Sequence, residues 1–114
     1  MSSPVSKYPR RSPPTGVTFS RFELAQLLNL YSRRVISGEW RDYAIDHGAG
    51  EAVFSIFRHS ADRPLFAVSK VAQPGRDRRT WVVRRGPEKL RQGDSIVDVL
   101  PALEGGPRLV RLES

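Results

Sequence analysis

The pattern of apolar and polar positions changes once along the chain, at residues 38–46. Before this stretch, apolar residues recur at spacings of three and four, which is the period of an amphipathic α-helix. After it, short runs of alternating or continuous apolar residues are separated by clusters of Gly, Pro, Asp and Ser, as is typical of β-strands. The pattern therefore predicts an α+β protein in which a long N-terminal helix precedes a sheet.

The helix is predicted over residues 21–37. Ser20 and Glu23 match a capping box, in which the serine hydroxyl accepts a hydrogen bond from the Glu23 amide and the carboxylate accepts one from the Ser20 amide. Gly38 is placed to end the helix in a left-handed conformation. The apolar residues on one face of the helix are Leu24, Leu27, Leu28, Tyr31 and Val35.

Four strands are predicted after the helix. They cover residues 40–46, 52–57, 65–71 and 80–85. Because the connections between them are short, consecutive strands should be antiparallel neighbours in a four-stranded meander on which the helix packs. The residues predicted to form the core are Trp40, Tyr43, Phe54, Phe57 and the helix leucines.

Beyond the strands, Gly86 and Pro87 are predicted to end the sheet. A short C-terminal helix should begin at Asp94 or Ser95, and Pro101 should kink or stop it because proline lacks a backbone N–H. The predicted organisation is a basic, Pro- and Ser-rich disordered tail, a single domain and a C-terminal tail, over residues 1–17, 18–105 and 106–114.

One part of the sequence resembles a known family. It reads Gly38-Glu39-Trp40-Arg41-Asp42-Tyr43-Ala44-Ile45-Asp46 and is continued by Ala52-Val53-Phe54-Ser55-Ile56-Phe57-Arg58. With these residues the chain resembles an uncharacterised bacterial family of small proteins that is classed only as a domain of unknown function. The resemblance extends from Phe19 to about Glu104, and Pro101 departs from its pattern. It implies domain boundaries and carries no activity, cofactor or catalytic residue.

Composition narrows the class of protein. A chain of 114 residues with 39% hydrophobic and 27% charged residues suits one soluble globular domain with a modest core. No apolar run approaches the ~20 residues that a membrane-spanning helix needs. The absence of cysteine excludes disulfides, thiol nucleophiles and cysteine-ligated metals. We expect an intracellular, cytoplasmic protein.

The net charge of +7 is unevenly distributed, and residues 58–92 alone carry a net +7. Such a segment favours phosphates or acidic surfaces, and its positive residues surround an aromatic ring that could stack on bases. The candidate nucleic-acid or anion contacts are Arg76, Arg78, Arg79, Trp81, Arg84, Arg85, Lys89 and Arg91. The alternatives are a solvated, solubilising arginine-rich loop and a Trp81 side chain buried beneath the helix.

No catalytic or metal-binding pattern is found. His47 and His59 are 12 residues apart, and neither has a second ligand at a recognised spacing. Asp42 and Asp46 share a strand face but stand ~13 Å apart, beyond the reach of a catalytic carboxylate pair. Asp42 is better explained by a structural hydrogen bond or ion pair. We expect no enzymatic activity and no cofactor or metal.

The remaining hypothesis comes from the sheet. One helix covers only one face of four strands, and an apolar face left over, with Phe66, Val68 or Trp81, would favour a protein partner or a homodimer. If both helices and the tail cover the sheet, the protein is a monomer. The function predicted is a small non-enzymatic binding or regulatory domain, namely a protein-interaction module that can self-associate. The alternative is a nucleic-acid-binding protein that uses the basic surface of residues 76–91, and no membrane contact is expected.

Overall fold

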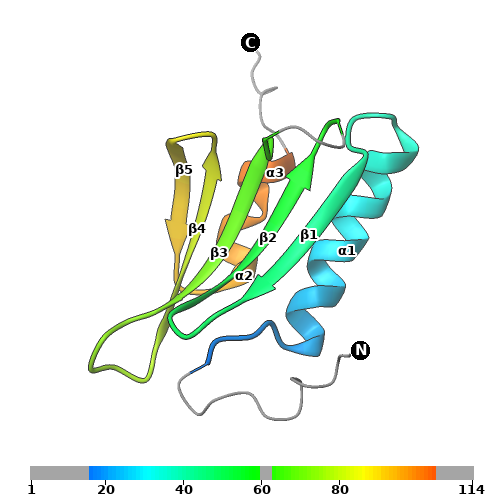
Figure 1. Ribbon diagram of the computed structural model, residues 1–114. Coiled ribbons are helices and arrows are strands. Elements are labelled where there is room, and N and C mark those ends of the chain that lie inside the picture. The colour runs from blue at the N-terminus through cyan, green and yellow to red at the C-terminus, as the bar shows by residue number, and fades with distance from the viewer. Residues whose placement is uncertain (1–15, 60–62, 105–114) are drawn as a thin grey trace, which may run out of the picture.

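The computed structural model describes residues 16–59 and 63–104, which fold into a five-stranded antiparallel sheet with helices on one side (Figure 1). The elements in chain order are α1 (Arg21–Ile36), β1 (Asp42–His47), β2 (Glu51–Phe57), β3 (Phe66–Ala72), β4 (Arg79–Arg85), β5 (Glu88–Gly93), α2 (Ile96–Val99) and α3 (Pro101–Glu104). The strand order is β1-β2-β3-β4-β5, so every strand pairs with its neighbours in sequence. The α+β class and the meander are confirmed.

The predicted signals at both ends of α1 are confirmed. The Glu23 amide donates to Ser20 Oγ at 3.1 Å, and the Ser20 amide donates to Glu23 Oε1 at 2.7 Å, so the capping box is complete. Gly38 ends the helix region with a φ of 84°. Within the described residues, no helix is both long and apolar enough to span a bilayer.

The predicted number of strands was wrong, because Gly86 and Pro87 do not end the sheet. They form a two-residue hairpin turn between the paired residues Arg85 and Glu88. Gly86 has a φ of 59°, and a glycine with positive φ followed by a residue with negative φ is the pattern of a type II′ turn. The chain therefore returns as a fifth strand, β5, along the edge of β4.

The C-terminal helix is broken at Pro101. The chain forms two four-residue helices, α2 and α3, which meet at Leu100 and Pro101. Leu100 donates its amide to Ile96 O, whereas Pro101 has no amide to continue the series. The prediction of a kink or early stop at Pro101 is confirmed.

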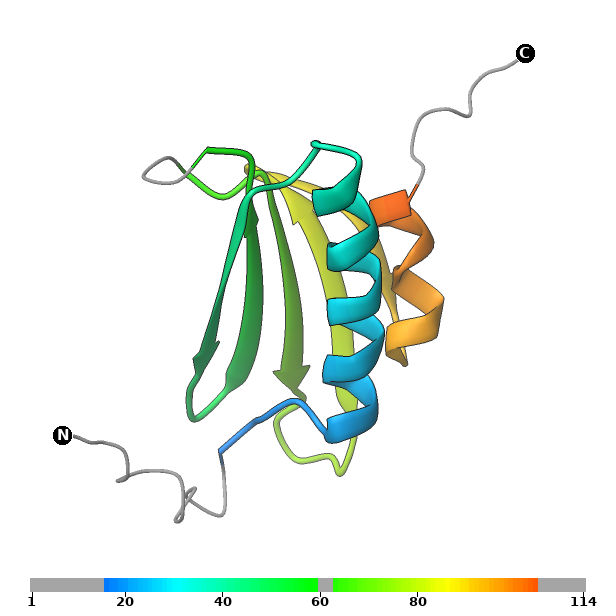
Figure 2. The ribbon, with the colours of Figure 1, turned by 90° about the vertical axis from the view of Figure 1, so that its right-hand side faces the viewer.

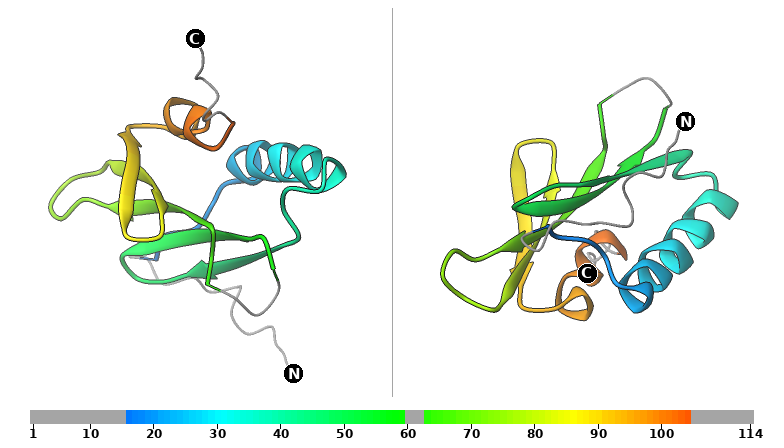
Figure 3. Two further views of the ribbon diagram at one scale, coloured as in Figure 1. Left: turned by 90° about the horizontal axis from the view of Figure 1, so that it is seen from above. Right: turned by 60° about the horizontal axis from the view of Figure 1, so that its bottom comes forward.

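All three helices lie on the same face of the sheet, which we call the covered face (Figures 2 and 3). Alternate residues of the strands point into it, and their register places Phe54, Val68 and Val83 in one row across β2, β3 and β4. Each of these three side chains is completely buried. Leu27 and Leu30 of α1 and Ile96 and Val99 of α2 cover them.

Two of the predicted core residues, Tyr43 and Phe57, are not part of the buried core. Trp40 and Phe54 are buried as predicted, but Tyr43 is 39% exposed and Phe57 is only half-buried, outside the core cluster. Tyr43 still stacks on Phe54 with ring centroids 5.2 Å apart, at the β1 edge of the covered face. Phe57 is in register with Asp42, and strand alternation places both on the opposite face.

The described chain begins with a segment that belongs to the domain. Val17 is 1% exposed, forms an isolated bridge with Gly48, and donates its amide to Gly48 O at 3.0 Å. Val17, which was assigned to the predicted tail, is thus part of the buried core. The rest of the predicted tails, residues 1–15 and 106–114, lies outside the described residues.

Candidate functional site

The residues predicted as a basic contact surface fall into two groups at opposite ends of the sheet. The group at the β3–β4 hairpin contains Arg76, Arg78 and Arg79. The group at the β4–β5 hairpin contains Arg84, Arg85 and Lys89. Because a strand rises about 3.3 Å per residue, roughly 17 Å of β4 separate Arg79 from Arg84. The structure therefore does not join them into one continuous surface.

Trp81 does not provide the aromatic platform suggested for this surface. Its side chain is 2% exposed and points into the covered face, where its ring lies 5.8 Å from that of Phe19. The Lys70 ammonium lies 5.8 Å from the Trp81 ring, which adds a cation–π contact. A ring buried in this way cannot stack on a base, so the alternative of burial is the correct one for Trp81.

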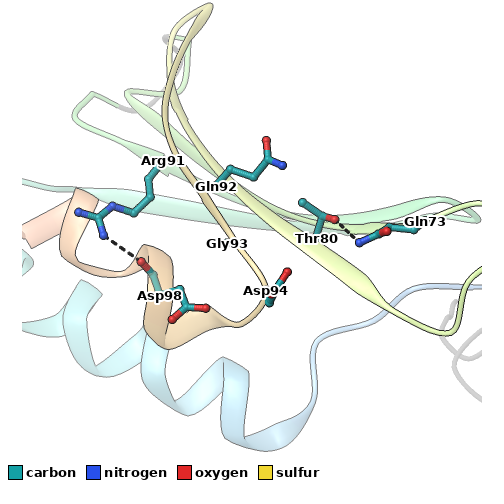
Figure 4. Close-up of a pocket in the computed structure, with 7 residues that line it drawn as sticks. All are labelled: Gln73, Thr80, Arg91, Gln92, Gly93, Asp94 and Asp98. Carbon is teal, nitrogen blue, oxygen red and sulfur yellow. Dashed lines mark hydrogen bonds between the residues drawn. The ribbon is translucent and has the colours of Figure 1, made fainter.

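The last predicted contact, Arg91, lies near a wide polar depression beside β5 (Figure 4). The residues that line this depression are Gln73, Thr80, Arg91, Gln92, Gly93, Asp94 and Asp98. Arg91 donates to the backbone oxygen of Asp98 at 3.1 Å, and the Asp98 carboxylate accepts the Ser95 amide at 3.2 Å. The Gln73 side chain donates to the Thr80 hydroxyl. The bonds to Asp98 hold α2 against β5, whereas the bond between Gln73 and Thr80 joins the ends of β3 and β4.

The titratable residues considered at the sequence level do not form a reactive cluster. Within residues 16–59 and 63–104, no group of three His, Cys, Asp or Glu side chains could hold a metal ion. Asp42 accepts a hydrogen bond from the Tyr43 amide at 2.8 Å, so its predicted structural role is confirmed. Burial raises the pKa of Tyr31, and the neighbouring Asp42 and then Tyr43 raise this pKa further.

The motif at residues 38–46 has a structural explanation. Arg34 of α1 donates to both oxygens of Glu39, at 3.0 and 3.1 Å, and to the backbone oxygen of Glu104 at the end of α3. Its guanidinium also lies 6.0 Å from the ring of the buried Trp40. Glu39 and Trp40 of the motif thus connect the end of α1, through Arg34, to the segment before β1 and to the end of α3.

The face of the sheet that faces away from the helices, which we call the open face, has an unusual composition. Strand alternation and register place small or apolar residues at its centre. They are Ala44, Val53, Ser55, Ala67, Ser69, Val71, Thr80 and Val82. An exposed sheet face usually carries polar and charged residues, yet this central set has no charged member.

The charged residues of the open face lie at its borders and are separated by sign. Acidic residues occupy the β1 side, and they are Asp42, Asp46 and, at the start of β2, Glu51. Basic residues occupy the opposite side, where Arg84 of β4 pairs with Lys89 of β5. The open face therefore has an acidic edge and a basic edge on either side of an uncharged centre.

A β-bulge puts Lys89 on the open face. The register of β4 and β5 shifts between Val83 and Arg84, so that Leu90 is the extra residue. Lys89 and Gln92 would point to opposite faces of a regular strand, whereas here Lys89 Nζ donates to Gln92 Oε1 at 2.8 Å. The bulge thus places both basic side chains, Arg84 and Lys89, on one face.

The apolar residues that the sequence suggested for a free face lie on the covered face instead. Val68 and Trp81 are fully buried there, and Phe66 packs on the core with its ring 6.0 Å from that of Trp40. The actual open-face residues were missed, although their signal was present. In the first three predicted strands a small residue, Ala44, Ser55 or Ala67, stands between two large apolar residues, and strand alternation places it on a second face.

An antiparallel sheet with helices on one face, and an open face whose centre is uncharged, defines a small α+β protein. The chain belongs to the family DUF2794, described as proteins of unknown function, whose sequence pattern matches residues 17–100. This range contains every strand and α1, and confirms that the resemblance was to a domain of unknown function. No curated protein and no solved structure shows significant similarity to the chain.

Proposed function

We propose that this protein is an interaction module that binds a second copy of itself through its open face. The observation that carries the proposal is the distribution of charge on that face, which has an acidic edge, an uncharged centre and a basic edge. A surface of this kind is complementary to itself when it is rotated so that opposite edges meet. A homodimer requires such self-complementarity.

The centre of the open face suits close packing against another sheet. Val82 and Ser55 are each only 8% exposed, although strand alternation places them on the face away from the helices. Alanine, serine, valine and threonine lose little side-chain entropy when they become buried, so the cost of ordering this surface is small. The flat centre supplies apolar contact area without large side chains that would have to interlock.

The charged edges select the orientation of the two copies. If the two-fold axis runs parallel to the strands and between the sheets, β1 of one copy lies over β5 of its partner. Asp42 and Asp46 then face the side of the partner that carries Arg84 and Lys89. An axis across the strands would place each acidic edge over the other acidic edge, which is electrostatically unfavourable.

The size of the face sets the expected affinity. Five strands at a spacing of about 4.8 Å and seven residues at about 3.3 Å give a footprint on the order of 500 Å² per copy. A standard stable interface buries about 800 Å² per partner. We therefore expect association at micromolar concentrations, strengthened by low salt because exposed ion pairs contribute at the edges.

Size-exclusion chromatography with light scattering, as a function of concentration, tests the proposal. Ser69 lies at the centre of the open face, so Ser69→Arg should place a long charged side chain in the interface and give a monomer at every concentration. The matched control is Ser32→Arg, on the exposed surface of α1, which should dimerise like the wild type. A wild-type chain that stays monomeric at high concentration would refute the dimer.

A charge exchange tests the orientation. Asp42→Lys combined with Asp46→Lys makes both edges basic, and Arg84→Glu combined with Lys89→Glu makes both edges acidic. Each double variant alone should associate several-fold more weakly than the wild type, and an equal mixture should recover association. Wild-type affinity in both separate variants would show that the edges do not meet.

In this proposal the protein acts without catalysis, in the bacterial cytoplasm, as its sequence led us to expect. The nucleic-acid alternative is less well supported, because the basic residues lie at two ends of the sheet and Trp81 is buried. Nucleic acids that track along a surface are bound by a continuous positive groove with accessible aromatic rings.

A further inference from the structure

We propose that a groove at the β4–β5 end of the sheet is a binding site for a phosphate group, either as free phosphate or as part of a small phosphomonoester. The groove has a volume of about 390 Å³, and its walls include Arg58, His59, Arg63, Leu65 and Arg85. Its volume is at the lower end of the range found for small-molecule sites, about 300–1,000 Å³. The site is separate from the proposed dimer surface, because strand alternation places Arg85 on the covered side.

Three arginines reach this groove from three different segments of the chain. Arg58 follows β2, Arg63 precedes β3, and Arg85 ends β4. The Leu65 amide donates to Ile56 O at 2.7 Å, which holds the two segments that carry Arg58 and Arg63 beside each other. These two arginines belong to the basic segment 58–92 but were not among the candidate contacts chosen from the sequence, and folding brings them to the same groove as Arg85.

The arginine side chains of the groove are suited to binding an anion. Arg85 is oriented by Phe66, since its guanidinium carbon lies 5.9 Å from the ring centroid. The ion pairs found among the described residues are Arg34 with Glu39 and Lys70 with Glu23, so no described carboxylate pairs with the arginines of the groove. Guanidinium groups bind phosphate oxygens in pairs of parallel hydrogen bonds, and a phosphate dianion would offset the repulsion among three of them.

The geometry favours a compact ligand over a nucleic-acid strand. The other basic group, at the β3–β4 hairpin, is roughly 17 Å away along β4, and Trp81 between the two groups is buried. A strand would need positive charge and stacking surfaces along its whole path. We therefore assign the groove to inorganic phosphate or to a phosphomonoester.

The test is a calorimetric and NMR titration of the full chain at low salt with inorganic phosphate, pyrophosphate, adenosine monophosphate and a single-stranded octanucleotide. The variant Arg58→Gln, Arg63→Gln, Arg85→Gln removes three charges from the groove. Its matched control, Arg76→Gln, Arg78→Gln, Arg79→Gln, removes three charges from the other hairpin. We expect saturable pyrophosphate binding with amide shifts at Leu65 and Gly86, weakened about tenfold or more by the groove variant and less than about twofold by the control.

The phosphate compounds distinguish the source of the anion. Equal binding of phosphate and adenosine monophosphate assigns the site to free phosphate, and tighter binding of the nucleotide assigns it to a phosphomonoester. Absence of saturable binding at millimolar pyrophosphate, or an equal loss in both variants, would overturn the proposal. So would octanucleotide binding that both variants weaken and pyrophosphate does not displace, because it would show an extended nucleic-acid surface. None of these results depends on whether the protein dimerises.

Discussion

The two faces of the sheet are built from alternating residues of the same five strands, and they differ in side-chain size and in the position of charge. The covered face carries Phe54, Val68, Trp81 and Val83, all buried beneath the three helices. The open face carries alanine, serine, threonine and valine at its centre and charges only at its edges. The covered face is thus suited to filling a volume, and the open face to presenting a flat surface.

Lys70 shows that the covered face also contains a charged residue, so the two faces differ in how a charge is used and not only in which residues they carry. It lies on the covered face in register with Trp81, and its side chain is only 14% exposed. Its ammonium donates to Glu23 Oε1 at 2.7 Å and to Thr18 O at 2.8 Å, so the charge is paired at the start of α1. A cation on the covered face is therefore part of the packing, whereas Lys89 at the open edge is available to a partner.

The largest difference in stability between the two faces is expected for substitutions at two adjacent residues, Thr80 and Trp81. Trp81→Ala removes a buried ring from the covered face and should lower the free energy of unfolding by about 3–5 kcal/mol. Thr80→Ala, at the neighbouring open-face position, should cost about 1 kcal/mol through the lost hydrogen bond to Gln73. Chemical denaturation followed by circular dichroism measures both, and similar losses would contradict the assignment of the faces.

A smaller effect is expected where a helix approaches the sheet closely. A Cβ added at Gly93 would lie 2.6 Å from the Cβ of Asp98, so Gly93→Ala must move α2 away from β5. We expect a loss of about 1–3 kcal/mol in the free energy of unfolding. Gly50→Ala is the control, since an added Cβ there meets nothing within 4 Å. If thermal denaturation shows equal stability for both variants, the close contact between α2 and β5 is not important.

Two adjacent valines provide the most direct comparison. Val83→Ala, on the covered face, should lower the free energy of unfolding by about 2 kcal/mol and leave association unchanged. Val82→Ala, on the open face, should cost about 1 kcal/mol or less in a dilute sample and weaken association. Denaturation at low concentration and light scattering at high concentration separate the two effects, and an unchanged dimer in Val82→Ala would argue against the open face as the interface.

The smallest expected effect concerns the two lysines. Lys70→Met keeps the apolar stem but removes the hydrogen bonds to Glu23 and Thr18, and should lower the free energy of unfolding by about 1 kcal/mol. Lys89→Met should leave the unfolding of the monomer unchanged and reduce the salt dependence of association. Denaturation and sizing at two salt concentrations measure these outcomes; equal destabilisation by both substitutions would remove the distinction between a packed and an available lysine.

The local elements of the fold could be predicted from the sequence. The capping box of Ser20 and Glu23, the end of α1 near Gly38 and the break at Pro101 all occur where the sequence indicates them. These signals depend on residues within a few positions of one another, so the surrounding structure need not be known. The fifth strand was missed because Gly86 and Pro87 were interpreted as an end, although a two-residue loop beginning with glycine also predicts a hairpin.

The candidate surfaces were decided by the tertiary structure. Alternation along a strand defines two faces, but it does not state which face the helices cover, and apolar residues on both sides of β2 and β4 left that choice open. The clustering of Arg58 and Arg63 with Arg85, like the opposition of an acidic β1 edge to a basic β5 edge, arises from contacts between distant segments. The sequence by itself thus determined the helices and most strands, because these follow from local backbone preferences. It also determined the family, because the pattern of the family matches residues 17–100. The covered and open faces were determined only by the packing of the helices, because this packing decides which side chains of the sheet are buried.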